Sequence, residues 1–456
     1  MGCLVSTPKD LGGNRRRPAN VGEISVFVPG LRIPKPVDFS PSLTDHVSKT
    51  LVERLSALRT RIVVMAGQEG GSTLADLQQA LEDYLPFLLG LVKDGSPLQQ
   101  KVQFVWVNQE DDAEETAMSN AWYEVLSVLH LMASLSLSQA NLCCYLLFDV
   151  AESRRTSIDV LLKAAGYLDC AVRQVLPLLP TELRRGLPVD LTEGVLRALC
   201  LQALGQGVDI QLGLAIDSTK ATLAVKRRLA CEMVKYWQQA QDNLTNLPLS
   251  NGWGEKHRFF VKWKYIEAKA AAYYYHGLIL DEGNTEKSHG MAVAALQAAD
   301  EFLKESKKTS DAFNTAPPLS RSEARFPMMY DFDFIDESKS VYALSILAGG
   351  NLSIHILGVL IWSRCRREIL EFNSGGGSVH RSMLNPPLWG TMKYLSEKIP
   401  KDTSSKVRIN QDLYSHDKIM ETAPTLPDFA LALKPDDYQL PLVHISWNDE
   451  NVNRGQ

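Results

Sequence analysis

The residues at the start of the chain are of the types that accept fatty-acid chains. The sequence opens Met1-Gly2-Cys3-Leu4-Val5-Ser6, and glycine at position two with serine at position six is the pattern for N-myristoylation of the Gly2 amine. Cys3, directly beside it, is suited to a thioester-linked palmitoyl chain. A single myristoyl chain gives only marginal and reversible membrane binding, so a second chain matters for stable attachment. The alternative is an ordinary chain start that holds these residues by chance.

A basic cluster follows the acylation pattern. Arg15, Arg16 and Arg17 lie in residues 1–20, a segment rich in glycine, proline and arginine that we expect to be a flexible, lipidated tether. Each basic residue near an anionic leaflet adds about 1 kcal/mol to membrane binding. A merely solvated linker remains an open alternative for the three arginines. No apolar run of secretory-signal length follows the start.

Residue patterns that carry catalysis are missing from the sequence. There is no G-x-S-x-G or H-E-x-x-H motif, and Gly67–Thr73 has the glycines of a phosphate-binding loop without its lysine. We therefore expect no enzyme, no cofactor, no metal site and no small-molecule substrate. The seven cysteines form no CxxC pair, which favours a reducing compartment without disulfides; they are Cys3, Cys143, Cys144, Cys170, Cys200, Cys231 and Cys365.

Composition narrows the class of protein further. The chain has 456 residues, of which 45% are apolar and 22% are charged, and this is globular composition. Lys plus Arg number 48 against 53 Asp plus Glu, so the net charge is −5. This balance excludes a strongly basic nucleic-acid binder, and we expect no nucleic-acid partner.

Helical periodicity dominates the elements that would hold any site. Apolar residues recur at three- and four-residue spacing over long stretches, and one run, 102–107, alternates as a strand does. The sequence predicts a mostly α fold with a small β-hairpin or sheet, and the alanine-rich run 268–275 suggests tetratricopeptide-like helix stacking without a strict repeat. The expected long helices are about 121–141, 157–179, 192–206, 220–243, 256–280 and 287–307.

Several landmarks follow one another in a familiar order. They are an extended proline-containing start (29–39), Phe104-Val105-Trp106, Trp122-Tyr123-Glu124, Ala164-Ala165-Gly166-Tyr167, Pro188–Thr192, Leu229-Ala230 with Tyr236-Trp237, and Lys264 with Ala270 to Tyr273. No single piece is specific. The ordered set, which covers 21–338 and resumes at 394–400, resembles the Bro domain (Bro-one domain) family of ALIX and BROX. Within that family the sequence is most similar to the plant BROX-homologue type.

Two features depart from the family pattern. The family's Ala-Gln-Ala-Gln-Glu run is here Gly205-Gln206-Gly207-Val208-Asp209, and the prenylated cysteine box of animal BROX proteins is replaced by Asn453-Arg454-Gly455-Gln456. Acyl chains at Gly2 and Cys3 would supply similar anchoring from the opposite end. The expected localisation is cytoplasmic, peripheral on endosomal or plasma membranes.

The resemblance implies a fold and a partner. Family members are boomerang-shaped and non-catalytic, and an apolar groove on them receives the C-terminal amphipathic helix of ESCRT-III subunits, the charged multivesicular body proteins, during endosomal sorting. Transferred to this sequence, the groove residues are Leu212, Val225 and Leu229. A one-residue gap would put Gln211 in place of Leu212. The ordinary alternative is that all of these are core residues.

The family also implies basic residues that face the membrane. The candidates are Lys226, Arg227 and Arg228, and, farther along, Lys256, Arg258 and Lys262. The alternative is that these basic residues lie on a helix face that contacts only solvent. A lipid-anchored helical scaffold without ESCRT-III binding is the alternative function.

One segment has no counterpart in the family. We expect 21–338 to form the body of the domain, 339–385 to be an insertion or variant segment, and 386–456 to be a proline-containing, irregular arm that partly rejoins the domain. Residues 340–363 carry no ionised side chain and are followed by Arg364, Arg366 and Arg367. A helix spanning a membrane at 341–362 is therefore a further alternative.

Overall fold

The computed structural model describes residues 26–28, 30–67, 74–93, 96–108, 115–146, 151–249, 252–283, 286–317, 391–413 and 422–447. The chain divides into two compact units. One unit, Met1–Glu23 with Phe334–Leu388, lies outside the described residues. So do the predicted acylation sites Gly2 and Cys3, the arginines Arg15, Arg16 and Arg17, and the segment 339–385. The second unit, Ile24–Asp333 with Trp389–Gln456, contains every element below.

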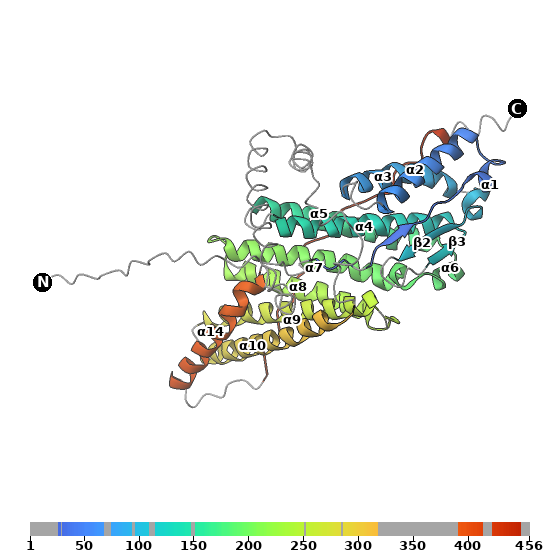
Figure 1. Cartoon of the computed structure of the whole chain (residues 1–456). Helices are drawn as coiled ribbons and strands as arrows, with labels where there is room; N and C mark the ends of the chain where they lie inside the picture. Colours follow the sequence, from blue (N-terminus) through green and yellow to red (C-terminus); the bar gives the residue numbers. More distant parts are fainter. Residues whose placement is uncertain are drawn as a thin grey trace, which may run out of the picture. The chain divides into compact units, whose positions relative to one another are not determined.

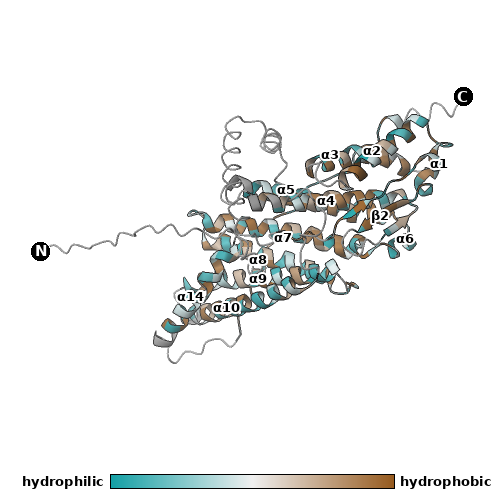
Figure 2. Ribbon diagram, in the orientation of Figure 1, coloured by the Kyte–Doolittle hydropathy of each residue, from teal (hydrophilic) through white to brown (hydrophobic). Residues whose placement is uncertain are grey.

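Long α-helices make up most of the second unit, as their apolar periodicity predicted. The longest have apolar residues on several faces, because each is covered by neighbours on more than one side. In Figure 2, hydrophobic residues predominate along α4. The helices are α1 (Ser40–Leu43), α2 (Lys49–Gly67), α3 (Leu74–Leu88), α4 (Ala121–Leu146), α5 (Ala151–Cys170), α6 (Thr181–Arg185), α7 (Glu193–Asp217), α8 (Leu223–Leu244), α9 (Gly252–Asp281), α10 (Glu286–Thr315) and α14 (Thr391–Leu413).

Short helical segments join these elements. After α5 the chain continues as one π-helical turn before it becomes a 3-10 turn, so the predicted helix 157–179 ends earlier as an α-helix than expected. The segments are η1 (Leu89–Val92), η2 (Pro97–Gln100), η3 (Ala171–Val175), η4 (Leu176–Leu178) and η5 (Val189–Leu191).

A three-stranded antiparallel sheet lies near the N-terminal end of the unit. Its order is β1 (Arg32–Pro34), β2 (Phe104–Asn108), β3 (Glu115–Met118), and Ile33 pairs with Val107. The predicted strand at 102–107 is therefore confirmed with a small shift. The other two strands were not predicted, since three or four residues are too few to show alternation.

The helices stack in chain order. Each of α4, α5, α7, α8, α9 and α10 packs against the next, and Figure 1 shows them following one another across the unit. This arrangement confirms the predicted mostly α fold with a small sheet. Among the described helices, α7 is long and apolar enough to cross a membrane, and 67% of its most apolar window is buried inside the unit. A helix in the core of a soluble protein can be equally long and apolar.

The predicted end of one helix was wrong. The helix predicted to end near Gln206 continues to Asp217 as α7, although it contains Gly205 and Gly207. Glycines inside a helix are tolerated where another group needs to approach the backbone. A Cβ on Gly205 would lie 3.0 Å from the indole of Trp237, so the two glycines allow close packing rather than ending the helix.

The C-terminal part is more ordered than its prolines predicted. Residues 391–413 form α14, a helix that includes Pro400 and packs against α10, α9 and α7. Its buried residues Met392, Leu395 and Ile399 are spaced by three and four, so one apolar stripe docks the helix. After it, residues 422–447 run without regular structure until a single turn at the end. We call this extended segment the strap.

Candidate functional site

Helices α7 and α8 form an antiparallel hairpin joined by residues 218–222, and the two predicted groove residues of α8 lie near that turn. Val225 and Leu229 are four residues apart and share one face of α8. The Val225 side chain is 46% exposed, and Leu229 is partly buried against the core. We call these two residues the α8 patch.

Leu212 does not belong to the exposed surface. Its side chain is 0% exposed, so it supports the hairpin from inside and cannot contact a partner in this conformation. The expectation that Leu212 lines an open groove is therefore not met. Gln211, the residue offered by a one-residue gap, is partly exposed. Leu212 is covered by its surroundings in the fold, and the spacing of apolar residues along one helix does not show which of them will be covered.

The basic residues of α8 differ in their surroundings. Arg228 is exposed, whereas Lys226 and Arg227 are partly buried. The guanidinium of Arg227 lies 5.8 Å from the ring centre of Phe429 on the strap, a cation–π contact that holds it against the domain. Arg227 thus does not present itself freely to a membrane.

Of the basic residues predicted on α9, Lys262 is exposed, whereas Lys256 and Arg258 are less available than expected. Lys256 is 4% exposed and donates to the carbonyl oxygen of Ala316 at 3.1 Å. Arg258 donates to the carbonyl oxygen of Leu247 at 2.9 Å. Both serve to tie segments of the domain together, so a membrane-facing role for these two positions is not supported by their geometry.

The strap crosses α8 one turn beyond Leu229. The Glu232 carboxylate is 2% exposed and accepts backbone N–H groups from Ala432 at 2.6 Å and Leu433 at 3.0 Å. The Tyr236 hydroxyl donates to the carbonyl oxygen of Leu433. Charge-assisted hydrogen bonds of this kind are the strong ones, so α8 fixes the position of the strap through a buried carboxylate.

The strap then crosses α7 and α5 at two glycines. A Cβ on Gly207 would lie 2.9 Å from Leu433, and a Cβ on Gly166 would lie 2.7 Å from the carbonyl oxygen of Asp436. The N–H of Asp436 donates to the carbonyl oxygen of Leu162 at 3.2 Å. At these two positions α7 and α5 have glycine, where a side chain would collide with the strap.

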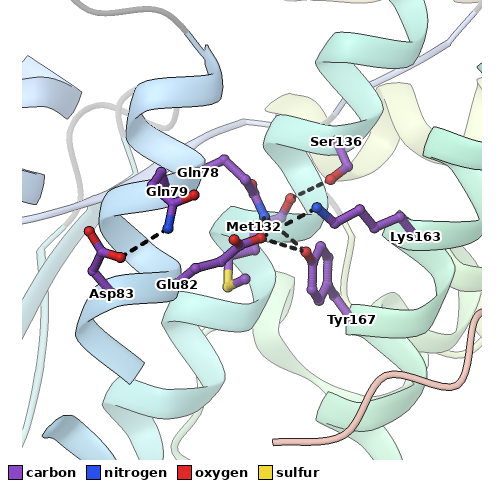
Figure 3. A network of polar contacts seen from close by, with 8 residues as sticks. All are labelled: Gln78, Gln79, Glu82, Asp83, Met132, Ser136, Lys163 and Tyr167. Carbon is purple, nitrogen blue, oxygen red and sulfur yellow. Dashed lines mark hydrogen bonds and ion pairs between the residues drawn. The ribbon is translucent and has the colours of Figure 1, made fainter. Parts of the chain in front are cut away.

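Near Gly166 a polar network joins α3 and α5 (Figure 3). One Glu82 oxygen accepts from the Tyr167 hydroxyl at 3.2 Å, from Lys163 at 3.3 Å and from Gln78 at 3.5 Å. Burial and the Glu82 carboxylate raise the pKa of Tyr167. The Tyr167 ring packs edge-on against Tyr438 of the strap, with ring centres 4.6 Å apart.

Burial shifts the pKa values of ionisable groups in the core. The pKa of His130 is lowered to about 4, chiefly by burial. Burial raises the pKa of the Cys200 thiol to about 12, so it stays protonated and unreactive. Within the described ranges, no group of three or more His, Cys, Asp or Glu side chains could hold a metal ion.

Sequence reasoning missed the residues that fix the strap. Glu232 and Tyr236 resemble ordinary polar positions of an amphipathic helix, and Leu433 lies in a proline-rich stretch. The one available signal was the glycines inside α5 and α7, Gly166 and Gly207, because glycine in a helix interior marks a close approach.

Comparison with solved structures relates this fold to ALIX, while no curated protein sequence matches the chain. A crystal structure of ALIX in complex with the SIVmac239 PYKEVTEDL late domain is similar with a TM-score of 0.60 and 16% identity, over 92% of this chain and 50% of that one. This chain thus spans half the length of that ALIX chain. At such low identity the likeness shows the fold alone.

Two shorter structures match over nearly their whole length. A complex of the ALIX BRO1 domain with CHMP4C gives a TM-score of 0.55 at 15% identity, over 92% of this chain and 99% of that one. A structure described as the basis for endosomal targeting by the Bro1 domain gives 0.54 at 14% identity, over 93% and 95%. A family model for the BRO1-like domain matches residues 35–326, well over half of the sequence. The chain belongs to the BRO1-like domain family.

Proposed function

We propose that this protein is a non-catalytic adaptor whose α7–α8 hairpin binds the C-terminal amphipathic helix of ESCRT-III subunits at endosomal membranes. The observation that carries the proposal is the α8 patch: Val225 is 46% exposed beside the partly buried Leu229 on one helix face. A similar fold, the ALIX BRO1 domain, is known in complex with CHMP4C, an ESCRT-III subunit. From the sequence resemblance alone, we propose that the chain is of the plant BROX-homologue type within the family.

The decisive experiment measures binding of a fluorescein-labelled peptide of the CHMP4C C-terminal helix by fluorescence anisotropy. The double variant Val225→Asp, Leu229→Asp puts charge into the contact, and desolvation of the carboxylates should cost several kcal/mol, or at least about a 100-fold loss of affinity. Unchanged binding would exclude the α8 patch as the site.

A matched control comes from α2. Val64 is 44% exposed, nearly as much as Val225, but lies on a different helix. Val64→Asp should therefore bind the peptide like the unmodified protein. Should the unmodified protein fail to bind any ESCRT-III helix, the alternative function applies, a lipid-anchored helical scaffold without ESCRT-III binding.

We further propose that acyl chains on Gly2 and Cys3 attach the adaptor to the membrane. Support comes from the sequence pattern, in which two chains give stable attachment where one does not. Intact-mass analysis of protein from cells should show one acyl increment lost in Cys3→Ser and both lost in Gly2→Ala. An unmodified N-terminus in the native protein would refute this part.

The membrane-spanning alternative at 341–362 can be tested on the same variants. Carbonate extraction releases peripheral proteins, while a spanning helix resists it. The Gly2→Ala protein should be recovered in the soluble fraction. Its retention in washed membranes would favour the span over the acyl anchor.

A further inference from the structure

The strap meets both helices of the hairpin at the same level. On α8 it is held by Glu232, and on α7 it lies against Gly207, where a Cβ would be 2.9 Å from Leu433. Leu433 therefore bridges the line along which the two helices face each other. We call this line, from the 218–222 turn to the strap, the α7–α8 seam. The α8 patch lies on it, and Leu229 is one helical turn from Glu232.

The seam is short. About ten residues of α8, from Leu223 to Glu232, lie between the turn and the strap, which at 1.5 Å per residue is roughly 15 Å, or about three helical turns. A helix that lay along the seam would meet the strap backbone at its end. Strap residues Leu431 and Leu433 are partly buried and pack on the core, so the strap offers an apolar edge there as well.

The charges around the seam are basic. Lys220 and Arg228 are exposed and Lys226 is partly exposed, while the first acidic residue of α8, Glu232, is occupied by the strap. On the α7 side, the carboxylate of Asp217 is ion-paired with Arg154. A partner that carried acidic residues beside its apolar stripe would complement this rim.

We propose that strap residues 429–433 form the end wall of the seam and that Glu232 positions this wall for the partner. The partner is then an amphipathic helix with acidic flanks that contacts the seam over no more than about three turns. This inference rests on the proposed ESCRT-III binding and adds the C-terminal strap to the binding site. Glu232 acts through the strap and is a positioning residue.

The test compares two ways of loosening the strap, with the labelled CHMP4C helix as probe. Glu232→Ala removes the acceptor of the Ala432 and Leu433 N–H groups next to the seam. Trp447→Ala removes the anchor at the far end of the strap, where the Trp447 indole Nε1 donates to the carbonyl oxygen of Phe87 at 3.0 Å. We expect Glu232→Ala to weaken peptide binding about tenfold, equal to 1.4 kcal/mol. Trp447→Ala should bind within about twofold of the unmodified protein, or under roughly 0.5 kcal/mol.

A conservative variant of Glu232 distinguishes its role in positioning the strap from an effect on the stability of the domain. Glu232→Gln keeps an acceptor oxygen for the two N–H groups and should restore most of the affinity lost in Glu232→Ala. Limited proteolysis of the strap reports its release in each variant. If Glu232→Ala frees the strap while the affinity stays unchanged or rises, the end wall is refuted. Equal losses in Glu232→Ala and Trp447→Ala would also refute it, since the strap would then act only through stability.

Two further results distinguish this inference from the proposed function. Binding that is lost in Val225→Asp, Leu229→Asp but kept in Glu232→Ala supports the α8 patch and overturns the end wall. No binding by the unmodified protein overturns both.

The acidic flanks of the partner are tested by the double variant Lys226→Glu, Arg228→Glu. It should weaken peptide binding at low salt and reduce the salt dependence of the affinity, whereas an unchanged affinity would refute the acidic flanks.

Discussion

The indole of Trp447, near the end of the strap, fills the space beside Gly90 that any side chain would need. A Cβ on Gly90 would overlap the indole ring, and the indole Nε1 donates to the carbonyl oxygen of Phe87 at 3.0 Å. Trp447 is only 6% exposed. The glycine and the tryptophan, 357 positions apart by their numbers, therefore form one contact that holds the strap on η1.

Gly90→Ala should expel Trp447 from this contact. Loss of a buried tryptophan costs up to about 3–5 kcal/mol, and relaxation of a chain end will reduce that, so we expect about 2 kcal/mol less stability in urea unfolding. The strap end should also become sensitive to protease. Gly67→Ala is the matched control, because nothing lies within 4 Å of a Cβ at Gly67. Similar losses in both variants would contradict the role of the tryptophan.

Leu212 and Val225 should respond differently to truncation, although the family resemblance implies that both are groove residues. Leu212→Ala leaves a cavity under the hairpin and should cost about 2–5 kcal/mol. Val225→Ala removes a half-exposed group and should change stability by under about 0.5 kcal/mol. Urea unfolding measures both. A large loss in Val225→Ala would mean that its side chain packs inside the protein in solution.

These two residues illustrate what the sequence could and could not predict. The long helices α8, α9 and α10 were predicted within a few residues of their ends (at the C-terminus of α10, within about eight), because apolar spacing along a helix is a local signal. Which member of the apolar stripe is covered depends on other helices. The strap contacts of Glu232 are about 200 positions away, so no local pattern could reveal them.

The helix α14 was missed for a related reason. Pro400 and its neighbouring prolines favoured an irregular arm, since proline removes a hydrogen bond from a helix interior. Burial of Leu395 and Ile399, both 0% exposed, offsets that loss through tertiary packing on α10. Formation of α14 therefore depends on packing against helices that are distant in the sequence.

His130 should make the folded protein less stable in mild acid. Its pKa is lowered to about 4, first by burial and then by Arg32, with Asp190 opposing. Unfolded chains bind the proton near pH 6.5, so between pH 6.5 and 4 the unfolded state binds more protons and stability falls as pH falls. This one group contributes a slope of up to about 1.4 kcal/mol per pH unit.

His130→Leu should remove the contribution of this one proton-binding group from the pH dependence of the unfolding free energy. Urea unfolding at several pH values measures that dependence. Neither ring nitrogen of His130 has a hydrogen-bond partner in the described part of the chain, so near pH 7 the variant should be no less stable. Burial also lowers the pKa of His257, to about 3, and that of His276, so both contribute a slope of the same sign. Identical slopes in the two proteins would show that His130 is accessible to protons in the folded state.

The buried ion pair between Arg59 and Glu124 ties the sheet to the helices. The two side chains are 1% and 0% exposed, and Glu124 also accepts from the Trp106 indole on β2 at 2.6 Å and from the Tyr84 hydroxyl on α3 at 3.3 Å. Burial lowers the pKa of Arg59 to about 10, which still leaves it charged at neutral pH. Each charge depends on the other, because an unpaired buried charge is costly.

A double-mutant cycle should therefore be strongly non-additive. Arg59→Met leaves the Glu124 carboxylate buried without its cation and should cost about 3–5 kcal/mol, and Glu124→Gln should cost a similar amount by leaving the guanidinium. The double variant removes both charges, while the amide oxygen introduced at position 124 still accepts from the Trp106 indole, so its loss should be well below the sum. Urea unfolding of the four proteins gives the coupling energy. Additive losses would mean that the two charges are stabilised separately, by water or by the surrounding hydroxyl groups.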